Sequence, residues 1–293
     1  MKDNSLGIII ILGVIAIALF GGSKGAGNNG LLTSGRGTPT QKQQNVEGRT
    51  KTTESGVDYL KDQLKTEEDV KNRSEYYGVV TLKHITKSKD PSSEYVTIRA
   101  SQTEKIISVT GWKLKSLSTG NSVNIPKATY LFFTGMQNVE EDIYLTSGDT
   151  LYLITGLSPN GVSFKSNKCS GYLGQFQKFT PYISNKCPLP ENEDLSSIPK
   201  TRASDTCFDY IDSMSQCKIP TKSLPTNLSS ECTKFIYEKV NYASCINVHK
   251  NDKDFYQNEW RVYLKRSETL WGNKREAIVL YDGTGKVVST LKY

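Results

Sequence analysis

The chain has 293 residues, of which 36% are apolar and 23% are charged, and this ordinary globular composition excludes a chain too polar to bury a core. Its formal charge is +7, but the excess is uneven: residues 76–185 carry eleven Lys and Arg against seven Asp and Glu, and residues 256–293 carry seven against four. This mild excess is compatible with anionic partners such as cell-wall polymer, lipid headgroups or nucleic acid, although a solvated surface without a partner explains it more simply.

An apolar segment opens the chain. Residues 6–20 contain no charge, follow Lys2 and precede a glycine-rich stretch. We predict that residues 1–23 direct export, either as a membrane anchor that spans the bilayer once through residues 6–22 or as a signal peptide whose cleavage would release a secreted protein. The apolar run is shorter than the about 20 residues of a bilayer span and at the upper end of a signal peptide's about 7 to 15. Because no small-x-small cleavage site follows, the pattern favours the anchor, although the positive-inside rule mildly opposes an extracytoplasmic C-terminus.

Residues 24–53 are rich in Gly, Ser, Thr, Asn and Gln with almost no large apolar side chain, which predicts a flexible linker. The composition changes in residues 54–75, where Val57, Leu60 and Leu64 recur at helical spacing. We predict one or two short helices there, packed on the domain that follows, with a stalk or self-association role as the alternative.

Two-residue alternation in residues 95–100 places Val96 and Ile98 on one face and polar side chains on the other, which is typical of a half-buried antiparallel strand. The alternation stops at Thr110-Gly111-Trp112, where a glycine tolerates a tight corner, and then starts again. The pattern therefore predicts two paired strands around this corner.

Four stretches along the chain read, in order, EYVTI, SVTGWKL, NIPKATYL and AIVLYDGTGKVVSTLKY. They resemble the successive strands of a lamin-tail domain of the type found in exported bacterial proteins, which implies an immunoglobulin-like β-sandwich. The resemblance covers about residues 76–183 and 256–293 and implies that the closing strands share one core with Trp112. The residues that would define this fold are Gly111 and Trp112 at the corner and Asp282, Gly283 and Gly285 in a closing hairpin loop.

Residues 158–173 form a Gly-, Ser- and Asn-rich stretch that carries aromatic residues and resembles an extension of lamin-tail proteins from small-celled bacteria. Loops of this length in compact domains are more often functional or covalently braced than idle. We therefore predict a candidate binding loop made of Ser158, Pro159, Asn160, Phe164, Lys165, Asn167 and Lys168.

The pattern turns helical in residues 184–255. One apolar face follows Cys207 with Ser204 as its cap, and another runs from Cys232 towards Cys245 with Ser229 or Ser230 as its cap. We predict a helical hairpin inserted late in the sandwich. The predicted fold is thus mainly β, with a disulfide-stapled helical insertion.

Six cysteines behind an export segment predict three disulfides in an oxidising compartment, with reduced core thiols as the alternative. An antiparallel hairpin would pair Cys217 with Cys232 and Cys207 with Cys245, leaving Cys169 for Cys187. Local pairing within each helix would span about 15 Å along ten residues, well beyond the about 7 Å that a disulfide allows between Cα atoms.

Motifs for chemistry are scarce. The two histidines and the wide cysteine spacing argue against a metal site, and no nucleophile motif or phosphate-binding loop is present, so we predict no cofactor and no enzymatic activity. An acidic patch of Glu140, Glu141, Asp142 and Asp149 suits either calcium or a solvated turn. Three tryptophans suit either a carbohydrate site or the core: Trp112, Trp260 and Trp271.

The function that these observations favour is a non-enzymatic cell-surface interaction or adhesion module, tethered to the membrane and displayed outside the cytoplasm. Its ligand would be a protein, a glycan or a cell-wall polymer. The alternative is an extracytoplasmic nucleic-acid-binding module that uses a basic sandwich face, and the weakest option is a hydrolase or thiol oxidoreductase.

Overall fold

The structure, a computed structural model, describes residues 69–101, 103–272 and 277–292, all of which belong to one compact unit, Tyr59–Tyr293. The predicted export segment and linker lie outside the described residues. Residues 54–68 of the predicted helical segment also lie outside them, whereas residues 69–71 of that segment are described and are helical. Within the described ranges, no helix is both long and apolar enough to cross a membrane.

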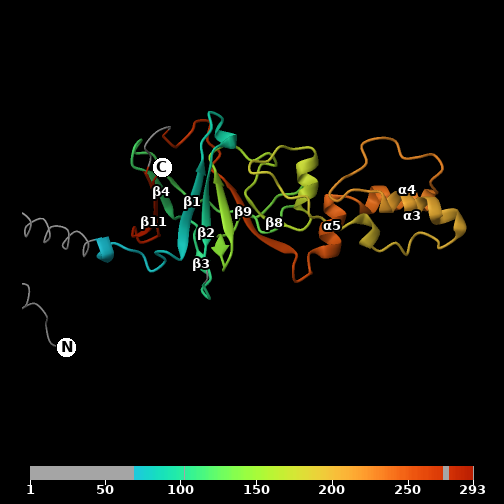
Figure 1. The fold of residues 1–293 in the computed structure, drawn as a ribbon, viewed down its shortest axis with the longest axis horizontal. Coiled ribbons are helices and arrows are strands. Elements are labelled where there is room, and N and C mark those ends of the chain that lie inside the picture. The colour runs from blue at the N-terminus through green and yellow to red at the C-terminus, as the bar shows by residue number, and fades with distance from the viewer. Residues whose placement is uncertain (1–68, 102, 273–276, 293) are drawn as a thin grey trace, which may run out of the picture. The chain divides into compact units, whose positions relative to one another are not determined.

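The described chain is mainly β, with a few short helices (Figure 1). Two sheets and a small third one hold the strands, and β7 and β9 form the parallel pair in a sheet whose other neighbours are antiparallel. The first sheet has the order β1 (Val80–Thr86), β2 (Tyr95–Ala100), β7 (Thr150–Ile154), β9 (Tyr256–Tyr263) and β8 (Phe164–Asn167). The second has the order β11 (Val287–Lys292), β10 (Ala277–Tyr281), β4 (Lys113–Ser116) and β5 (Ser122–Asn124), and the third pairs β3 (Ile107–Ser108) with β6 (Tyr144–Leu145).

The strand predicted at residues 95–100 is confirmed as β2, but its predicted pairing across the corner is wrong. β2 pairs with β1 and β7, whereas β4 pairs with β10 and β5 in the other sheet. The corner at Gly111, whose φ is 80°, instead joins β3 of the third sheet to β4 of the second sheet. The strands β2 and β4 lie in different sheets because Ile98 of β2 and Leu114 of β4 pack into the same core from opposite sides.

The closing strands share this first core, as predicted. Ile278 and Leu280 of β10 lie in one cluster with Trp112, and Leu280 is paired with Leu114. The Asp282 carboxylate caps the hairpin loop by accepting hydrogen bonds from the backbone N–H groups of Thr284 and Lys286. Gly285 adopts φ 82° at the turn that the sequence predicts.

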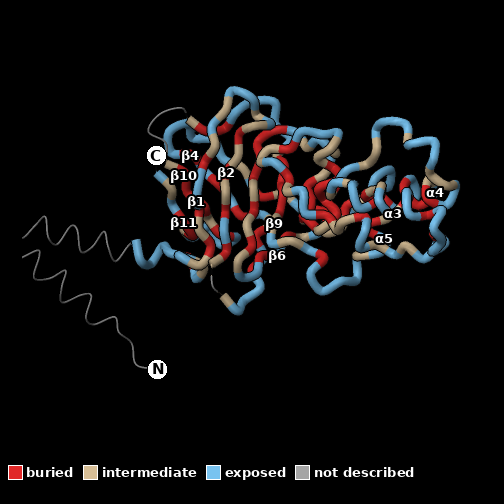
Figure 2. Tube along the Cα trace, turned by 45° about the vertical axis from the view of Figure 1, so that its right-hand side comes forward, coloured by how far each residue is buried: buried red, intermediate tan, exposed pale blue. Residues whose placement is uncertain are grey.

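A second core lies on the outer face of the first sheet, and the buried segments of Figure 2 therefore extend well beyond the space between the sheets. Strand β9 serves both cores, since Trp260 faces the first and Tyr263 the second. The second core is built largely by residues 168–255, here called the insertion. Residues 76–183 were all predicted to belong to the sandwich. The last of them, residues 169–183, instead contribute to the second core through Cys169, Tyr172, Leu173, Phe179 and Ile183.

The insertion contains helices α3 (Asp205–Asp212), α4 (Ser230–Lys239) and α5 (Tyr242–His249). Short 3-10 turns complete it: η2 (Ser170–Gln175), η3 (Pro190–Asn192) and η4 (Arg202–Ser204); a further one, η1 (Pro91–Ser93), precedes β2. Ser229 caps α4 as predicted, whereas Ser204 makes no capping hydrogen bond to α3. The single helix predicted from Cys232 to Cys245 is two, because Asn241 accepts a hydrogen bond from Ser244 N–H and starts α5.

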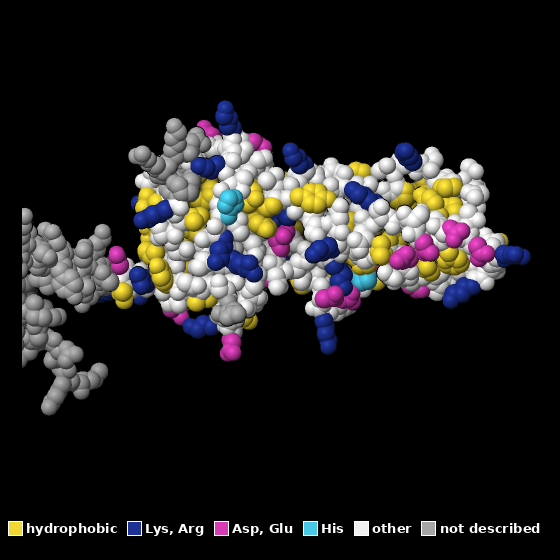
Figure 3. Space-filling model, viewed as in Figure 1, with side chains coloured by type: hydrophobic (Ala, Val, Ile, Leu, Met, Phe, Trp, Pro, Cys, Tyr) yellow, Lys and Arg dark blue, Asp and Glu magenta, His cyan; other side chains and the backbone are white. Residues whose placement is uncertain are grey.

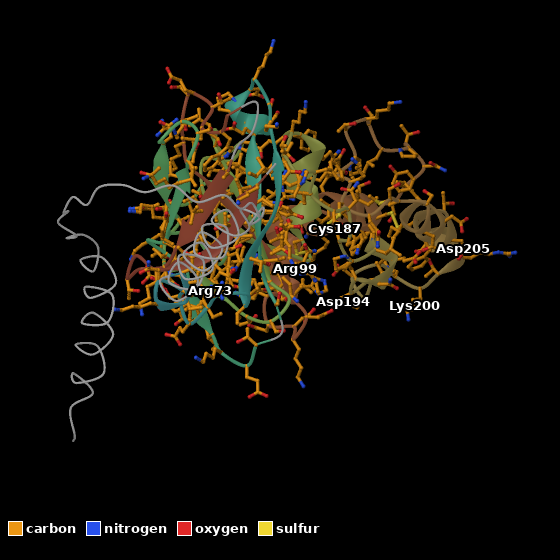
Figure 4. The ribbon with its side chains drawn as sticks, turned by 60° about the vertical axis from the view of Figure 1, so that its left-hand side comes forward. Arg73, Arg99, Cys187, Asp194, Lys200 and Asp205 are labelled. Carbon is orange, nitrogen blue, oxygen red and sulfur yellow. A yellow bond between two sulfur atoms is a disulfide. The ribbon has the colours of Figure 1, made fainter. Side chains whose placement is uncertain are left out.

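All six cysteines form disulfides, but each predicted pair is wrong. The bridges are Cys169–Cys245, Cys187–Cys217 and Cys207–Cys232. The predicted pairs required one straight second helix, and the break before α5 removes Cys245 from the end of α4 and lets it reach η2. Figure 4 shows Arg73 and Arg99 in the part of the unit that carries the strands, and Cys187, Asp194, Lys200 and Asp205 in the insertion.

Candidate functional site

Three of the seven residues of the predicted binding loop lie in a strand and not in a loop. Phe164 and Asn167 are the ends of strand β8 and are fully buried. Phe164 belongs to the second core, and the Asn167 side-chain oxygen accepts a hydrogen bond from Cys169 N–H. These two residues therefore hold the fold and cannot touch a ligand.

The two lysines of the predicted loop also have partners within the fold. The Lys165 ammonium lies 5.2 Å from the ring centroid of Trp260, 5.9 Å from that of Tyr130 and 6.0 Å from that of Tyr256. Its Nζ is 3.9 Å from the fully buried Asp149 carboxylate. Lys168 Nζ lies 2.9 Å from Asp252 and 2.7 Å from Asp254. Both ammonium groups are thus placed to neutralise the chain's own carboxylates.

The predicted acidic patch is not gathered into one site. Asp142 pairs with Lys127 at 3.4 Å and Glu140 with Lys265 at 3.8 Å, while Asp149 is buried beside Lys165. In the part of the chain that the structure describes, no three His, Cys, Asp or Glu side chains are grouped to hold a metal ion. The three tryptophans are at most 5% exposed and belong to the first core, which agrees with the core alternative for Trp112, Trp260 and Trp271.

The remaining part of the predicted loop leads to a hollow of about 330 Å³, here called the apolar pocket. It lies where the insertion meets the loop that follows Tyr130. Four segments far apart in the sequence supply its lining together with Asn160. The lining residues are Phe132, Thr134, Asn160, Tyr172, Leu173, Phe176, Gln177, Ile219, Asn241, Tyr242 and Ala243.

The walls of the apolar pocket are fixed by covalent and hydrogen bonds. The Cys169–Cys245 bridge ties the start of η2 to α5, and the Tyr242 hydroxyl donates to the Phe132 carbonyl at 2.9 Å. Gln175 Nε2 donates a hydrogen bond to the Ile219 carbonyl at 2.8 Å, and Gln175 Oε1 accepts one from the Ile219 N–H at 2.7 Å. The walls are therefore held in place before any ligand arrives, which lowers the entropic cost of binding.

Glycine is required beneath one of these walls. A Cβ atom on Gly171 would stand 2.2 Å from Sγ of Cys217 and 3.0 Å from the carbonyl oxygen of Ser184. The Cys187–Cys217 bridge therefore packs directly on the η2 backbone, and this close approach helps to position the segment that carries Ile219.

The lining of the apolar pocket contains no charged side chain. Burial raises the pKa of the Tyr172 hydroxyl to about 12 and also raises the pKa of Tyr242, so both phenols stay neutral at physiological pH. Phe176, which also lines the pocket, is 65% exposed. The pocket thus offers apolar surface, neutral amides and an exposed aromatic ring.

No protein-family model and no curated protein matches this chain. What the apolar pocket can do therefore follows from its own geometry. Asn160 is the one lining residue that the sequence pattern predicted as part of a binding loop. Aromatic residues in a polar stretch, such as Phe176, are the one signal that pointed to the rest, and that signal does not distinguish a pocket from a core.

A second, basic hollow of about 460 Å³ lies at the β1–β2 end of the first sheet. Lys83 and Arg99 line it, and among the described residues neither has an acidic partner. No aromatic side chain lines it; the other lining residues are Gly78, Val79, Ala100, Ser101, Ser147 and Gly148. On the face drawn in Figure 3, Lys and Arg side chains are spread over the described unit, and acidic side chains lie at both of its ends, with several grouped at the end that carries α3 and α4.

A polar cluster closes the insertion around His249. Its Nε2 lies 3.0 Å from Glu193 Oε1 and its Nδ1 lies 2.8 Å from Asp252 Oδ2, so the imidazole links η3 to the loop that follows α5. Burial lowers the pKa of His249, but the hydrogen bonds and charges of the two carboxylates outweigh burial, and the net pKa is raised.

The stability of the protein should therefore depend on pH through His249. Because the folded-state pKa is raised, this contribution is complete below the unfolded pKa of about 6.5 and is lost as pH rises through the folded value. We expect the melting temperature of the wild type to exceed that of His249→Gln most at about pH 6, with the difference shrinking towards pH 8.5. Thermal melts of both proteins over this range measure the effect, and parallel curves would contradict it.

Proposed function

We propose that this chain is a non-enzymatic interaction module, tethered to a bacterial membrane through residues 6–22 and displayed outside the cytoplasm, or secreted if the first segment is cleaved. We also propose that its sheets are a lamin-tail domain of the immunoglobulin-like kind. Three disulfides are typical of proteins in oxidising compartments and support this location. Two sheets packed over one core support the sandwich.

The observation that carries the proposed function is the apolar pocket. An uncharged hollow with fixed walls and an exposed aromatic ring at its edge has the composition of the central contact in a protein interface. Its lining provides apolar surface and hydrogen-bonding groups but no nucleophile beside a base, and both of its phenols are neutral. These groups suit binding rather than covalent chemistry.

The test places a charge in the apolar pocket without disturbing the fold. Ala243 is an exposed lining residue in the first turn of α5, where a carboxylate is tolerated. We expect Ala243→Glu to weaken binding of the labelled segment Tyr59–Tyr293 to intact cells of the source bacterium at least tenfold. Asn247→Glu adds the same charge to the same helix at an exposed position outside the pocket and should bind as the wild type does.

Equal binding by both variants would contradict the role of the apolar pocket, because the contact would then lie elsewhere. The absence of saturable binding to any cell surface would contradict the proposed function. Protease treatment of intact cells that expressed the full chain provides the matching check on location, since a cytoplasmic module would be protected.

The basic hollow supports a second candidate, a nucleic-acid-binding module. Lys83 and Arg99 have no acidic partner among the described residues, so both cations are available to phosphates. The hollow lacks an aromatic ring on which a base could stack, which makes this candidate the weaker one. If it holds, Lys83→Ala with Arg99→Ala should lower DNA affinity and flatten its dependence on salt, while Ala243→Glu should change neither.

A further inference from the structure

We infer that the apolar pocket receives one large apolar side chain from an extended, uncharged segment of a partner protein, and that Asn160 and Gln177 bind the peptide group beside that side chain. This inference rests on the proposed function and specifies its ligand.

The size of the apolar pocket fits a side chain. Its volume of about 330 Å³ lies at the lower end of the roughly 300 to 1,000 Å³ found for ligand pockets, so it holds a single bulky group rather than a whole cofactor. Aromatic rings from three segments of the chain face this space: Phe132, Tyr172, Phe176 and Tyr242. Such rings bind another aromatic or branched side chain well, because offset and edge contacts add to the burial of apolar area.

The edge of the apolar pocket offers one unused donor and one unused acceptor. Asn160 uses its side-chain oxygen to accept from the Ser158 hydroxyl, while its Nδ2 is buried and has no partner among the described residues. Gln177 uses its Nε2 to donate to the Pro159 carbonyl at 3.1 Å, which leaves its Oε1 unbonded within the described chain. Because Pro159 and Asn160 are adjacent, the free N–H group and the free oxygen belong to neighbouring positions on one edge.

These two groups match a peptide group. A peptide group presents one carbonyl acceptor and one N–H donor, which Asn160 Nδ2 and Gln177 Oε1 complement. A buried donor without a partner destabilises the free protein, so a ligand carbonyl that satisfies Asn160 removes this cost on binding.

The neutral lining selects against charge. A charged side chain that entered the apolar pocket would lose its water and find no counter-ion among the eleven lining residues, which is strongly unfavourable. A sugar ring is a poorer occupant than an apolar side chain, because hydroxyl groups on its several sides would face Phe132, Leu173 and Ile219 without partners. The geometry thus favours an apolar peptide over a glycan or an anionic polymer.

Small amides provide the direct test. The segment Tyr59–Tyr293 contains both cores and every disulfide, so it is titrated alone with the N-acetyl amides of Leu, Phe and Trp, followed by NMR. We expect these probes to shift the backbone amide of Ala243 and the side-chain amides of Asn160 and Gln177. The N-acetyl amides of Ala, Asp and Lys, and the disaccharide chitobiose, should bind at least tenfold more weakly.

Variants then separate the contribution of the aromatic rings to binding from that of Asn160 and Gln177. Gln177 is exposed, so Gln177→Ala should keep the fold. We expect Gln177→Ala to weaken binding of the N-acetyl amide of Phe three- to tenfold, and Asn160→Ala to weaken it by the same factor. Ala243→Glu should abolish binding and Asn247→Glu should leave it unchanged. Unchanged affinity in both amide variants would overturn the role of the edge, and tighter binding of chitobiose or of the charged amides would overturn the ligand class.

The outcomes also distinguish this inference from the proposed function. If no amide binds while Ala243→Glu still abolishes binding to cells, the ligand class is wrong and the interaction module stands. If the amides bind as expected while the segment shows no saturable binding to any cell surface, the chemistry of the pocket is right and the proposed function is wrong.

Discussion

Replacing Cys169 and Cys245 together by alanine is expected to lower the free energy of unfolding by about 3 to 5 kcal/mol. The bridge closes a loop with a sequence separation of 76, so its loss frees a large part of the unfolded chain. It also joins η2 to α5, and both cysteines lie in the second core. Urea denaturation of the segment Tyr59–Tyr293 measures the change, and a loss below about 1 kcal/mol would show that the second core holds α5 without this bridge.

The control is the shorter bridge. Cys207–Cys232 has a sequence separation of 25, so the corresponding double alanine variant should lose less stability than the Cys169/Cys245 variant. Peptide mapping of the same unreduced samples checks which cysteines are joined. A fragment that linked Cys217 to Cys232 would restore the hairpin pairing that the sequence suggests.

Arg261→Met is expected to lower the free energy of unfolding by about 3 to 4 kcal/mol. Arg261 is fully buried on the outer face of β9, where its Nε donates to Glu259 at 2.7 Å and its terminal nitrogens donate to the carbonyls of Pro181 and Tyr182. The variant leaves these two carbonyls without their donor and Glu259 without its counter-charge. Chemical denaturation measures the loss.

Two further variants show whether burial is the cause. Lys105→Met removes a cation from an ion pair with Glu75 in which both side chains are more than 60% exposed, and it should lower the free energy of unfolding far less than Arg261→Met does. The double variant Arg261→Met/Glu259→Met should be more stable than Arg261→Met alone, because it removes the unpaired carboxylate. Equal losses for Lys105→Met and Arg261→Met would contradict the role given to the buried network.

Two-residue alternation predicted the strands well because the buried faces of β2, β4 and most of β7 follow it closely. The same pattern says nothing about which sheet a strand joins, so the corner at Gly111 was taken for a hairpin when it is a crossing. Disulfide pairing failed for a similar reason. It depended on where two helices end: α3 stops at Asp212, before Cys217, and a break at Val240 and Asn241 separates α4 from α5.

The apolar pocket was harder to predict than the strands. Its lining comes from segments that meet only after the insertion has folded on the outer face of the first sheet, and no periodicity reports such a meeting. Lys165 and Asn167 show the opposite error, since polar residues in a Gly- and Ser-rich stretch looked exposed. They are drawn into the fold because β9 needs a partner on its second edge, and β8 supplies it.

The position of β9 between β7 and β8 has a consequence for synthesis. Strands β7 and β8 are complete once residue 167 has been made, yet the strand that joins them begins at Tyr256. At roughly 5 to 20 residues per second, the ribosome takes about 4 to 18 s to make the intervening stretch. Throughout this interval β7 carries an open edge that another chain can pair with. Aggregation during production should therefore arise from chains truncated before β9, and a chaperone that shields a strand edge would help this protein most before its last forty residues emerge.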